Sequence, residues 1–396
     1  MIIRRKKNKK EENPFYDPSL KNRHKSSRRF KLFTLASLVF SIAFLAFFLT
    51  DIVTKGSPAF KQAYLLVDVT YNETSIKNYR KSIDRKYTGV VSRAWIREVP
   101  NMIEKDPSLM GKTVSTWVLA DDQVDQYLKG HYYKLKRKDR IIVDDLKAEN
   151  KAQLQFNKLF FENGDSKTPE YAGFKSAIIG SVLTLLITML VAFPIGVMTA
   201  IYLEEFAEDN KFTQIIEVNI NNLAAIPSIL FGLLGLAIFI SLFGLPRSSP
   251  LVGGLTLALM TLPIIIVSAR AALRSVPDSI RQAGYGLGLT KIQVTRDHVL
   301  PLAFPGIMTG SIIGLAQAMG ETAPLIIVGM IAFIPDAPSS VTQAATVMPA
   351  QIFTWAGMPE RMYIEKTAAG IIVLLSVLIS LNTLAIYLRK KFEVKW

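Results

Sequence analysis

One carboxylate, Glu321, stands in the long apolar stretch Val299–Pro335, which contains no other ionisable residue. An acidic side chain at the centre of a membrane-spanning helix costs about 2.5–3.5 kcal/mol on insertion scales, so we expect such a residue to be functional. Gly320 and Pro324 flank it, and because proline lacks a backbone N–H, the helix is expected to break there. Glu321 could line a path for an ion, or it could accept hydrogen bonds from loosened amides or pair with a cation of another subunit.

Other polar side chains share these apolar stretches and could serve the same path. They could donate hydrogen bonds to an anion, or they could join helices, where such bonds contribute about 0.6 kcal/mol on average. The sequence leaves both interpretations open. The set consists of Thr322 and Gln317 near Glu321, and of Asn221, Asn222 and Ser228 in the segment Val218–Pro246.

The polar loop that follows residue 274 carries the signals of a short helix. Pro277 suits the first turn of a helix, and the acidic Asp278 suits its positive end. We expect this helix to run to Leu287. Gly288 is then expected to adopt the left-handed conformation that commonly ends helices.

A second short helix is expected directly after that glycine. Thr290 and Gln293 have the spacing of a capping box, in which each side chain bonds to the other residue's backbone N–H. Pro301 is expected to stop this helix before the next apolar segment. The loop is therefore predicted to be two short helices joined at a glycine elbow.

The elements that hold these residues are membrane helices, because the charge is segregated. Of the formal charge of +15, residues 1–31 contribute twelve Lys/Arg against three Asp/Glu, and mean hydropathy is +0.27. This pattern excludes a soluble or disordered protein, and no nucleic-acid partner is expected because the basic excess flanks an apolar segment. The absence of cysteine excludes thiolate metal sites, and with three histidines we expect no metal and no cofactor.

Six apolar segments are long enough to cross a membrane, which takes about 20 residues in a helix. The Lys/Arg bias of their flanks predicts that both termini are cytoplasmic, that residues 54–170 lie outside and that the loop 271–301 lies inside, after a first transmembrane helix at 32–53. The tail 1–31 is also expected to contact anionic lipid. The segments are Leu32–Thr50, Ser176–Leu203, Val218–Pro246, Ser248–Ala269, Val299–Pro335 and Thr367–Leu388.

The polar segment 54–170 is predicted to form a small α+β domain. Its β-rich or alternating stretches predict strands, and a later stretch predicts a helix with Leu146, Leu154, Phe156, Leu159 and Phe160 on its buried face. The predicted strands are Ala63–Val69, Thr88–Ile96, Thr113–Leu119 and Tyr132–Val143, and the predicted helix is Asp144–Phe161.

The loop resembles the cytoplasmic EAA loop of ABC-transporter permease subunits. The family pattern is Glu-Ala-Ala, then glycine after three residues, then Leu-Pro about a dozen residues later. Here it reads Gln282-Ala283-Gly284, then Gly288, then Leu300-Pro301, so the first and third positions depart from the pattern. The resemblance implies that this loop contacts an ATPase subunit.

Two further stretches narrow the resemblance to the PstA-type permease of the bacterial phosphate ABC importer. They are the run from Ala225 to Gly235, AIPSILFGLLG, and the run from Gly320 to Leu325, GETAPL. The resemblance covers about residues 172–396. It implies an all-α polytopic permease core with five transmembrane helices, preceded by the first helix and the inserted α+β domain.

The resemblance also implies partners and a location. Relatives work with a second, PstC-like permease, two PstB-like ATPase subunits and a PstS-like phosphate-binding protein, in the bacterial cytoplasmic (inner) membrane. The chain contains no Gly-x-x-x-x-Gly-Lys-Ser/Thr loop, so ATP hydrolysis is expected in a partner and not here. Many relatives carry arginine where this chain has Gln317, which leaves open how the charge of phosphate is balanced.

Two other functions remain open on the sequence. The substrate could be another oxyanion, molybdate or sulfate, or the chain could be a membrane receptor that senses a ligand through residues 54–170. The GETAPL run favours phosphate. Glu321 fits phosphate because a carboxylate can accept a hydrogen bond from a P–OH group, whereas it repels sulfate, which carries no proton.

Overall fold

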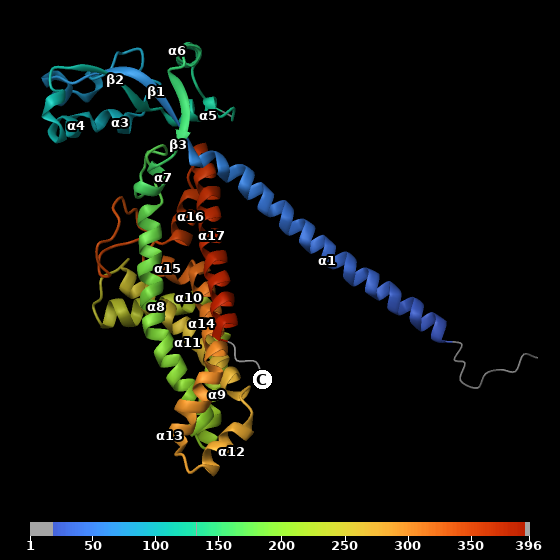
Figure 1. Cartoon of the computed structure of the whole chain (residues 1–396). Helices are drawn as coiled ribbons and strands as arrows, with labels where there is room; N and C mark the ends of the chain where they lie inside the picture. Colours follow the sequence, from blue (N-terminus) through green and yellow to red (C-terminus); the bar gives the residue numbers. More distant parts are fainter. Residues whose placement is uncertain (1–18, 132, 393–396) are drawn as a thin grey trace, which may run out of the picture. The chain divides into compact units, whose positions relative to one another are not determined.

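The computed structural model of the chain describes residues 19–131 and 133–392 (Figure 1). Residues 1–18 of the predicted basic tail, Tyr132 and the end of the chain from Glu393 lie outside the described residues. The first long helix is α1, Leu20–Gly56, and it contains the first predicted membrane segment. It is long and apolar enough to cross a membrane.

A three-stranded antiparallel sheet organises the region after α1, with β1 between β2 and β3. Alternate residues of β1 are buried, among them Leu65, Val67 and Val69, as expected for a strand with one face on a core. Short helices cover that core, so the predicted α+β character is confirmed. The strands are β1 (Lys61–Thr70), β2 (Thr113–Leu119) and β3 (Ala152–Phe156), and the helices are α2 (Glu73–Lys77), α3 (Arg93–Arg97), α4 (Val99–Lys105), α5 (Asp122–Leu128), α6 (Arg137–Ala148) and α7 (Leu159–Glu162), with 3-10 turns η1 (Ser57–Phe60), η2 (Tyr79–Lys81) and η3 (Pro107–Leu109).

Two of the predicted strands are wrong. The stretch Thr88–Ile96 contains the start of α3, because the Ser92 hydroxyl accepts a hydrogen bond from the Trp95 N–H at 3.4 Å and so caps a helix. The stretch Tyr132–Val143 runs into α6, whose buried residues Val143 and Leu146 are three positions apart, at helical spacing.

The predicted helix Asp144–Phe161 is also wrong over its middle. Residues 152–156 form β3, which pairs antiparallel with β1. Leu154 and Phe156, predicted to be buried, are 39% and 60% exposed, whereas Phe160 is fully buried. The apolar residues of this stretch fit a period of two as well as a helical period, and pairing with β1 decides between them.

Five helices among the described residues are long and apolar enough to cross a membrane, and a bent pair brings the number to six if it counts as one span. The first is α1, and the other four contain, in whole or in large part, the corresponding predicted segments. These four are α8 (Lys175–Ile201), α11 (Pro250–Arg274), α14 (Leu300–Gly320) and α17 (Arg361–Phe392). The π-helical turn η4 (Tyr202–Phe206) extends α8, and α16 (Met348–Ala356) precedes α17.

Two predicted spans are interrupted. Val218–Pro246 is bent by 102° between α9 (Lys211–Ala224) and α10 (Ser228–Gly235), where Pro227 cannot continue a helix. A π-helical segment, η5 (Leu236–Leu242), continues α10. Val299–Pro335 is not one span either, because α14 ends at Gly320 and only the short α15 (Ala323–Ile327) follows.

Small residues allow α8, α11 and α14 to pack closely. A Cβ on Gly254 of α11 would lie 2.6 Å from Cβ of Ile187 on α8, and one on Gly310 of α14 would lie 2.2 Å from Oγ of Ser268 on α11. The Thr188 hydroxyl donates a hydrogen bond to the Gly254 carbonyl at 3.1 Å. Close backbone approach and hydroxyl bonds of this kind hold helices together in a membrane.

Candidate functional site

The loop 271–301 contains two short helices joined at a glycine. The first, α12, spans Asp278–Gly286, and the second, α13, spans Lys291–Val294. Gly288 has φ of +78°, the left-handed region, so the predicted glycine elbow is confirmed. The capping box of Thr290 and Gln293 is also present, with the Thr290 N–H donating to Gln293 Oε1 at 2.8 Å.

The prediction that Pro301 stops the second helix is wrong. The chain continues from α13 through the π-helical turn η6 (Thr295–Val299) into α14, and one helical run covers residues 291–320. The Leu300 N–H bonds to the Thr295 carbonyl, five residues earlier. Because this wide turn changes the hydrogen-bond spacing just before Pro301, the proline stands in the first turn of α14, where a helix does not need its N–H.

Gly284 lets the two arms of the loop touch. It is buried, and a Cβ at this position would lie 2.7 Å from Cγ2 of Val294. Glycine at the third position of the EAA-like run therefore follows from this close approach. The two residues before it, Gln282 and Ala283, are exposed on α12.

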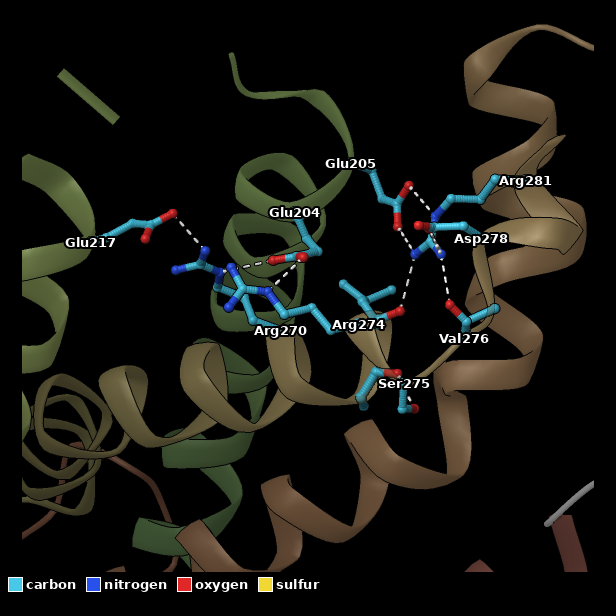
Figure 2. A network of polar contacts seen from close by, with 11 residues as sticks. Glu204, Glu205, Glu217, Arg270, Arg274, Ser275, Val276, Asp278 and Arg281 are labelled. Carbon is cyan, nitrogen blue, oxygen red and sulfur yellow. Dashed lines mark hydrogen bonds and ion pairs between the residues drawn. The ribbon is translucent and has the colours of Figure 1, made fainter. Parts of the chain in front are cut away.

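A network of ion pairs fixes the base of this loop to the end of α8 (Figure 2). Glu204 on η4 accepts hydrogen bonds from Arg270 at 3.3 Å and from Arg274 at 2.7 Å, both near the end of α11. Arg270 also pairs with Glu217 of α9 at 2.5 Å. Ion pairs of Arg270 and Arg274 thus join η4, α11 and α9.

Arg281 of α12 makes the most buried of these contacts. Its guanidinium donates to both carboxylate oxygens of Glu205, at 2.6 and 3.3 Å, and the two side chains are only 14% and 4% exposed. It also donates to the carbonyls of Val276 at 2.8 Å and Leu273 at 3.0 Å, where α11 ends. One side chain therefore joins α12, η4 and the end of α11.

The sequence reasoning missed this network, although a signal was present. Four acidic residues between 204 and 209 interrupt the basic character expected of a cytoplasmic turn. Such an exception indicates that nearby cations need partners, and Arg270, Arg274 and Arg281 are the cations that supply them.

The tip of the loop exposes apolar side chains. Leu287 at the elbow is 81% exposed, Ile292 of α13 is 65% exposed and Tyr285 of α12 is 44% exposed. We name these three residues the apolar tip. That this tip contacts another protein stays a prediction.

Glu321 lies at the break between α14 and α15, as its flanking glycine and proline predict. It is the C-cap residue of α14 with an extended conformation, and its N–H bonds to the Ala318 carbonyl at 3.2 Å. Thr322 precedes the first residue of α15, and both side chains are partly exposed. The carboxylate is therefore at a helix end and not inside a regular span.

The two stretches that resemble PstA-type permeases pack against each other. A Cβ on Gly232 of α10 would lie 2.7 Å from Cα of Pro324 in α15, so only glycine allows this approach. The residues around the bend of α9 and α10 are thereby held against those around the break at Glu321. Ser228, the first residue of α10, belongs to this packed pair of helices.

The other predicted path residues are less closely grouped. Gln317 is exposed on α14 one turn before Glu321, and Asn221 and Asn222 are exposed near the end of α9. Within residues 19–131 and 133–392, no hydrogen bond joins either asparagine to Glu321. Their common role in a path therefore stays a prediction.

A second buried cluster of charges links the sheet region to α17. Glu365 near the start of α17 accepts hydrogen bonds from Gln126 of α5 at 2.7 Å and from Lys129 at 3.0 Å, and contacts His131 at 2.7 Å. Lys129 also pairs with Asp125 at 2.5 Å. These contacts make the start of α17 and α5 one packed unit, which no local sequence signal predicted.

Two known family models match parts of the chain. The family model described as "Binding-protein-dependent transport system inner membrane component" matches residues 192–394. A "Domain of unknown function (DUF3333)" matches residues 17–87 and 76–137.

Curated relatives point the same way. The chain is 30% identical over 235 residues to the phosphate transport system permease protein PstA of Yersinia pestis, which covers 59% of this chain and 78% of that protein. It is 32% identical to the probable ABC transporter permease protein YqgI of Bacillus subtilis (strain 168), over 44% of this chain and 58% of that one. It is 35% identical to PstA of Mycobacterium leprae (strain TN), over 40% and 52%. In the last two matches the chain spans little more than half of the relative's length.

Among solved structures, a chain of the MetNI methionine ABC transporter matches 54% of this chain and 95% of its own length, at 17% identity and a TM-score of 0.42. That likeness is too slight to support an argument. The family match covers residues 192–394, and the match to the Yersinia pestis protein covers 78% of that protein. The chain therefore belongs to the family of binding-protein-dependent transport system inner membrane components, as a multi-pass permease of the PstA type.

Proposed function

We propose that this chain is a permease subunit of an ATP-driven importer of inorganic phosphate and forms half of the translocation path. The observation that carries the proposal is the loop 271–301, whose apolar tip is exposed while its base is fixed by buried ion pairs. A loop that only connected two helices would need neither feature. A loop that receives force from another protein needs both.

The coupling works as a rigid lever in this proposal. The apolar tip docks in a groove of a separate ATPase subunit, and motion of that subunit displaces α12. Arg281 passes the displacement to Glu205 at the end of α8 and to the end of α11, because it bonds to both. Since packed helices move as rigid bodies, the shift reaches the opposite ends of α8 and α11.

Phosphate is the proposed substrate because the named PstA relatives are phosphate transport permeases. In the proposal, the path follows the break at Glu321 and the packed pair α10–α15. Thr322, Gln317 and Ser228 contribute hydrogen bonds there, with Asn221 and Asn222 near the bend. The proposed partners are a second permease, two ATPase subunits and a phosphate-binding protein, in the bacterial inner membrane, and the match to a binding-protein-dependent transport component supports them.

The proposed orientation has the loop 271–301 in the cytoplasm and residues 54–170 outside. The sheet region leads into the first residue of α8, whereas the ion pairs of the loop reach the turn after its last residue. The 27 residues of α8 extend about 40 Å at about 1.5 Å per residue, more than the roughly 30 Å of a bilayer's hydrocarbon core. The two regions therefore fit opposite sides of one membrane (Figure 1).

A reporter that is active only in the cytoplasm tests this orientation. Fused after residue 100 it should be silent, and fused after Asp209, in the turn that follows η4, it should be active. Activity of the first fusion would overturn the proposed orientation.

Uptake by cells tests the function itself. A strain that lacks this chain should lose high-affinity uptake of radiolabelled phosphate, and a plasmid copy should restore it. Excess unlabelled sulfate or molybdate should not compete. Unchanged phosphate uptake in the deletion strain, or loss of sulfate uptake instead, would refute the proposed substrate.

A further inference from the structure

The sheet region contains a pocket whose charged lining is entirely cationic. Its volume is about 630 Å³, and it lies between η2, the chain that follows it and α3. Five of its nine lining residues are basic and none is acidic. We name this feature the basic pocket and define it by Arg80, Lys81, Arg85, Arg93 and Arg97.

None of these five exposed cations has a carboxylate partner in the part of the chain that the structure describes. No carboxylate lies within 4.0 Å of their charged groups there; among the described lysines and arginines of this region, the ion-paired ones are Lys129, Arg140 and Lys151. The five cations of the pocket differ from the other unpaired ones in that they surround one cavity. Like charges gathered around one cavity repel one another and destabilise the compact state. Such an arrangement is expected where a bound anion offsets the repulsion.

The pocket is built on rigid structure. Ile83 and Ile96 form part of its wall and are 5% and 3% exposed, so the cavity rests on the hydrophobic core. Ile83 also forms a β-bridge with Val69 of β1. Arg93 and Arg97 stand four residues apart, on one face of α3, which begins at a capping serine. The backbone that carries the cations is thus held by the core, and their side chains are exposed.

The cations around the pocket also lower the pKa of the Tyr79 phenol. Tyr79 lines the pocket, and its hydrogen bond with Arg97, followed by the charges of Arg97 and Arg80, lowers its pKa from the ordinary 10.0. An anionic group in the pocket would find this hydroxyl as an additional donor.

We propose that the basic pocket binds a soluble compound that carries two or more phosphoryl groups. Guanidinium groups match phosphate oxygens with paired hydrogen bonds, and four of the five cations are arginines. One orthophosphate carries only one to two negative charges near neutral pH, too few for five cations. The volume of the pocket lies in the range of small-ligand sites, about 300–1,000 Å³, and so admits a larger anion. This site is separate from the proposed path and does not depend on the transported substrate.

Titration calorimetry of the full-length chain tests the proposal, in nanodiscs of phosphatidylcholine at about 0.15 M salt. The ligands are tripolyphosphate, pyrophosphate, orthophosphate and sulfate. The affinity should rise with the number of phosphoryl groups, and sulfate should bind weakly or not at all. Equal affinity for sulfate and tripolyphosphate, or no binding of either, would overturn the proposal.

Variants locate the binding. Arg93→Gln with Arg97→Gln should weaken tripolyphosphate at least about tenfold, since each charge-assisted hydrogen bond lost has an effect of that order. Arg80→Gln with Lys81→Gln, from the opposite wall, should do the same. Arg137→Gln with Lys138→Gln removes the same charge from exposed positions on α6 and should leave the affinity within about twofold. Equal loss in all three double variants would show that only net charge matters.

A second set of nanodiscs distinguishes a soluble ligand from an anionic lipid headgroup, which offers the same phosphate chemistry. Tripolyphosphate should bind nanodiscs that contain phosphatidylglycerol with the same affinity as phosphatidylcholine nanodiscs. Loss of binding to the wild-type chain in phosphatidylglycerol would assign the pocket to lipid and refute a soluble ligand.

Discussion

Glu321 occupies an electrostatically unfavourable position, which bears on its proposed role. It caps the C-terminal end of α14, where the helix dipole is negative and disfavours an anionic side chain, typically by 0.3–1 kcal/mol. The next helix, α15, has only five residues. A cation or a hydrogen-bond donor beside the carboxylate would offset this unfavourable interaction. A P–OH group of the substrate, or a cation of the partner permease, would do so.

Glu321→Gln separates these two roles, because it keeps the shape and removes the charge. If Glu321 faces the path, the complex should still assemble, phosphate uptake should fall and sulfate should begin to stimulate ATP hydrolysis, since the repulsive charge is gone. Uptake and ATPase assays on the purified complex measure both effects. Glu208→Gln, at an exposed position after η4, is the matched control and should behave as wild type. Loss of assembly would favour the structural role, and wild-type selectivity would exclude both.

Gly288 and Gly286 form a natural pair for testing the elbow. Gly288→Ala introduces a Cβ at φ of +78° and should cost about 1 kcal/mol or more in the local fold, which misplaces α13 and weakens the contact with the ATPase. Gly286→Ala adds a Cβ to α12 in open space and should be neutral or slightly stabilising. Co-purification of the ATPase with each variant measures the difference. Identical yields would contradict a role for the elbow geometry.

Asp121 makes the sheet region sensitive to pH. Burial, and then the neighbouring Asp122, raises the pKa of Asp121 from 3.8 to about 7 in the folded state. The folded chain therefore holds a proton that the unfolded chain releases near pH 4, so this group lowers the free energy of unfolding as pH rises from about 4 to about 7. The change is on the order of 4 kcal/mol, at about 1.4 kcal/mol for each of about three pKa units.

Asp121→Asn should reduce the loss of unfolding free energy between pH 5 and pH 7.5. Asparagine keeps an oxygen that can accept a hydrogen bond from the Gln123 N–H, but it does not titrate. Thermal unfolding of the full chain at the two pH values measures it. Asp106→Asn is the control, since hydrogen bonds from Ser108 lower the pKa of Asp106 and it stays charged throughout this range. A pH dependence unchanged by Asp121→Asn would disprove the assignment.

At the scale of elements, the proposed coupling runs through the pair Arg281–Glu205, which joins the loop to the turn after α8 and to the end of α11. Removing one partner of a buried pair leaves an unpaired charge and costs about 3–5 kcal/mol, whereas an exposed pair contributes about 0–1 kcal/mol. Arg281→Gln should therefore leave the ATPase bound at the apolar tip but uncouple ATP hydrolysis from uptake. The ratio of phosphate transported to ATP hydrolysed measures the coupling.

Arg296→Gln is the matched control in the same loop. Arg296 pairs with Asp297 at 2.7 Å, but their side chains are 70% and 43% exposed. The variant should keep the wild-type ratio. Equal ratios for both variants would mean that the buried pair does not transmit motion.

The elements also show which features the sequence could predict. Gly288 and the capping box of Thr290 were predictable because a positive φ and a cap depend only on nearby residues. The pair Arg281–Glu205 was not, because its partners are 76 residues apart in the chain. The strand β3 was missed for the same reason, since its pairing with β1 decides between two periods that its own residues allow. Membrane segments were predicted well where composition suffices, and Gly320 and Pro324 predicted the helix break at Glu321. The bend at Pro227 was not predicted.

At the scale of the whole molecule, packed helices connect three regions: the loop 271–301, the cluster around Glu365 and the break at Glu321. The apolar tip and its ion pairs lie at one end of α8, and the cluster around Glu365 ties the sheet region to the start of α17. The break at Glu321 follows α14, which packs against α8 and α11. Force applied at the tip therefore has a continuous packed route to the proposed path. The central claim is that ATP hydrolysis in a partner drives phosphate through this chain.

Uptake by a reconstituted complex tests that claim most directly. The chain, its second permease and the ATPase subunits are placed in proteoliposomes with the phosphate-binding protein, and accumulation of radiolabelled phosphate is measured with and without ATP on the ATPase side. We expect accumulation against a gradient that requires both ATP and this chain. Arg281→Gln should abolish the accumulation while ATP hydrolysis continues. Accumulation that is independent of ATP, or that persists when this chain is omitted, would contradict it.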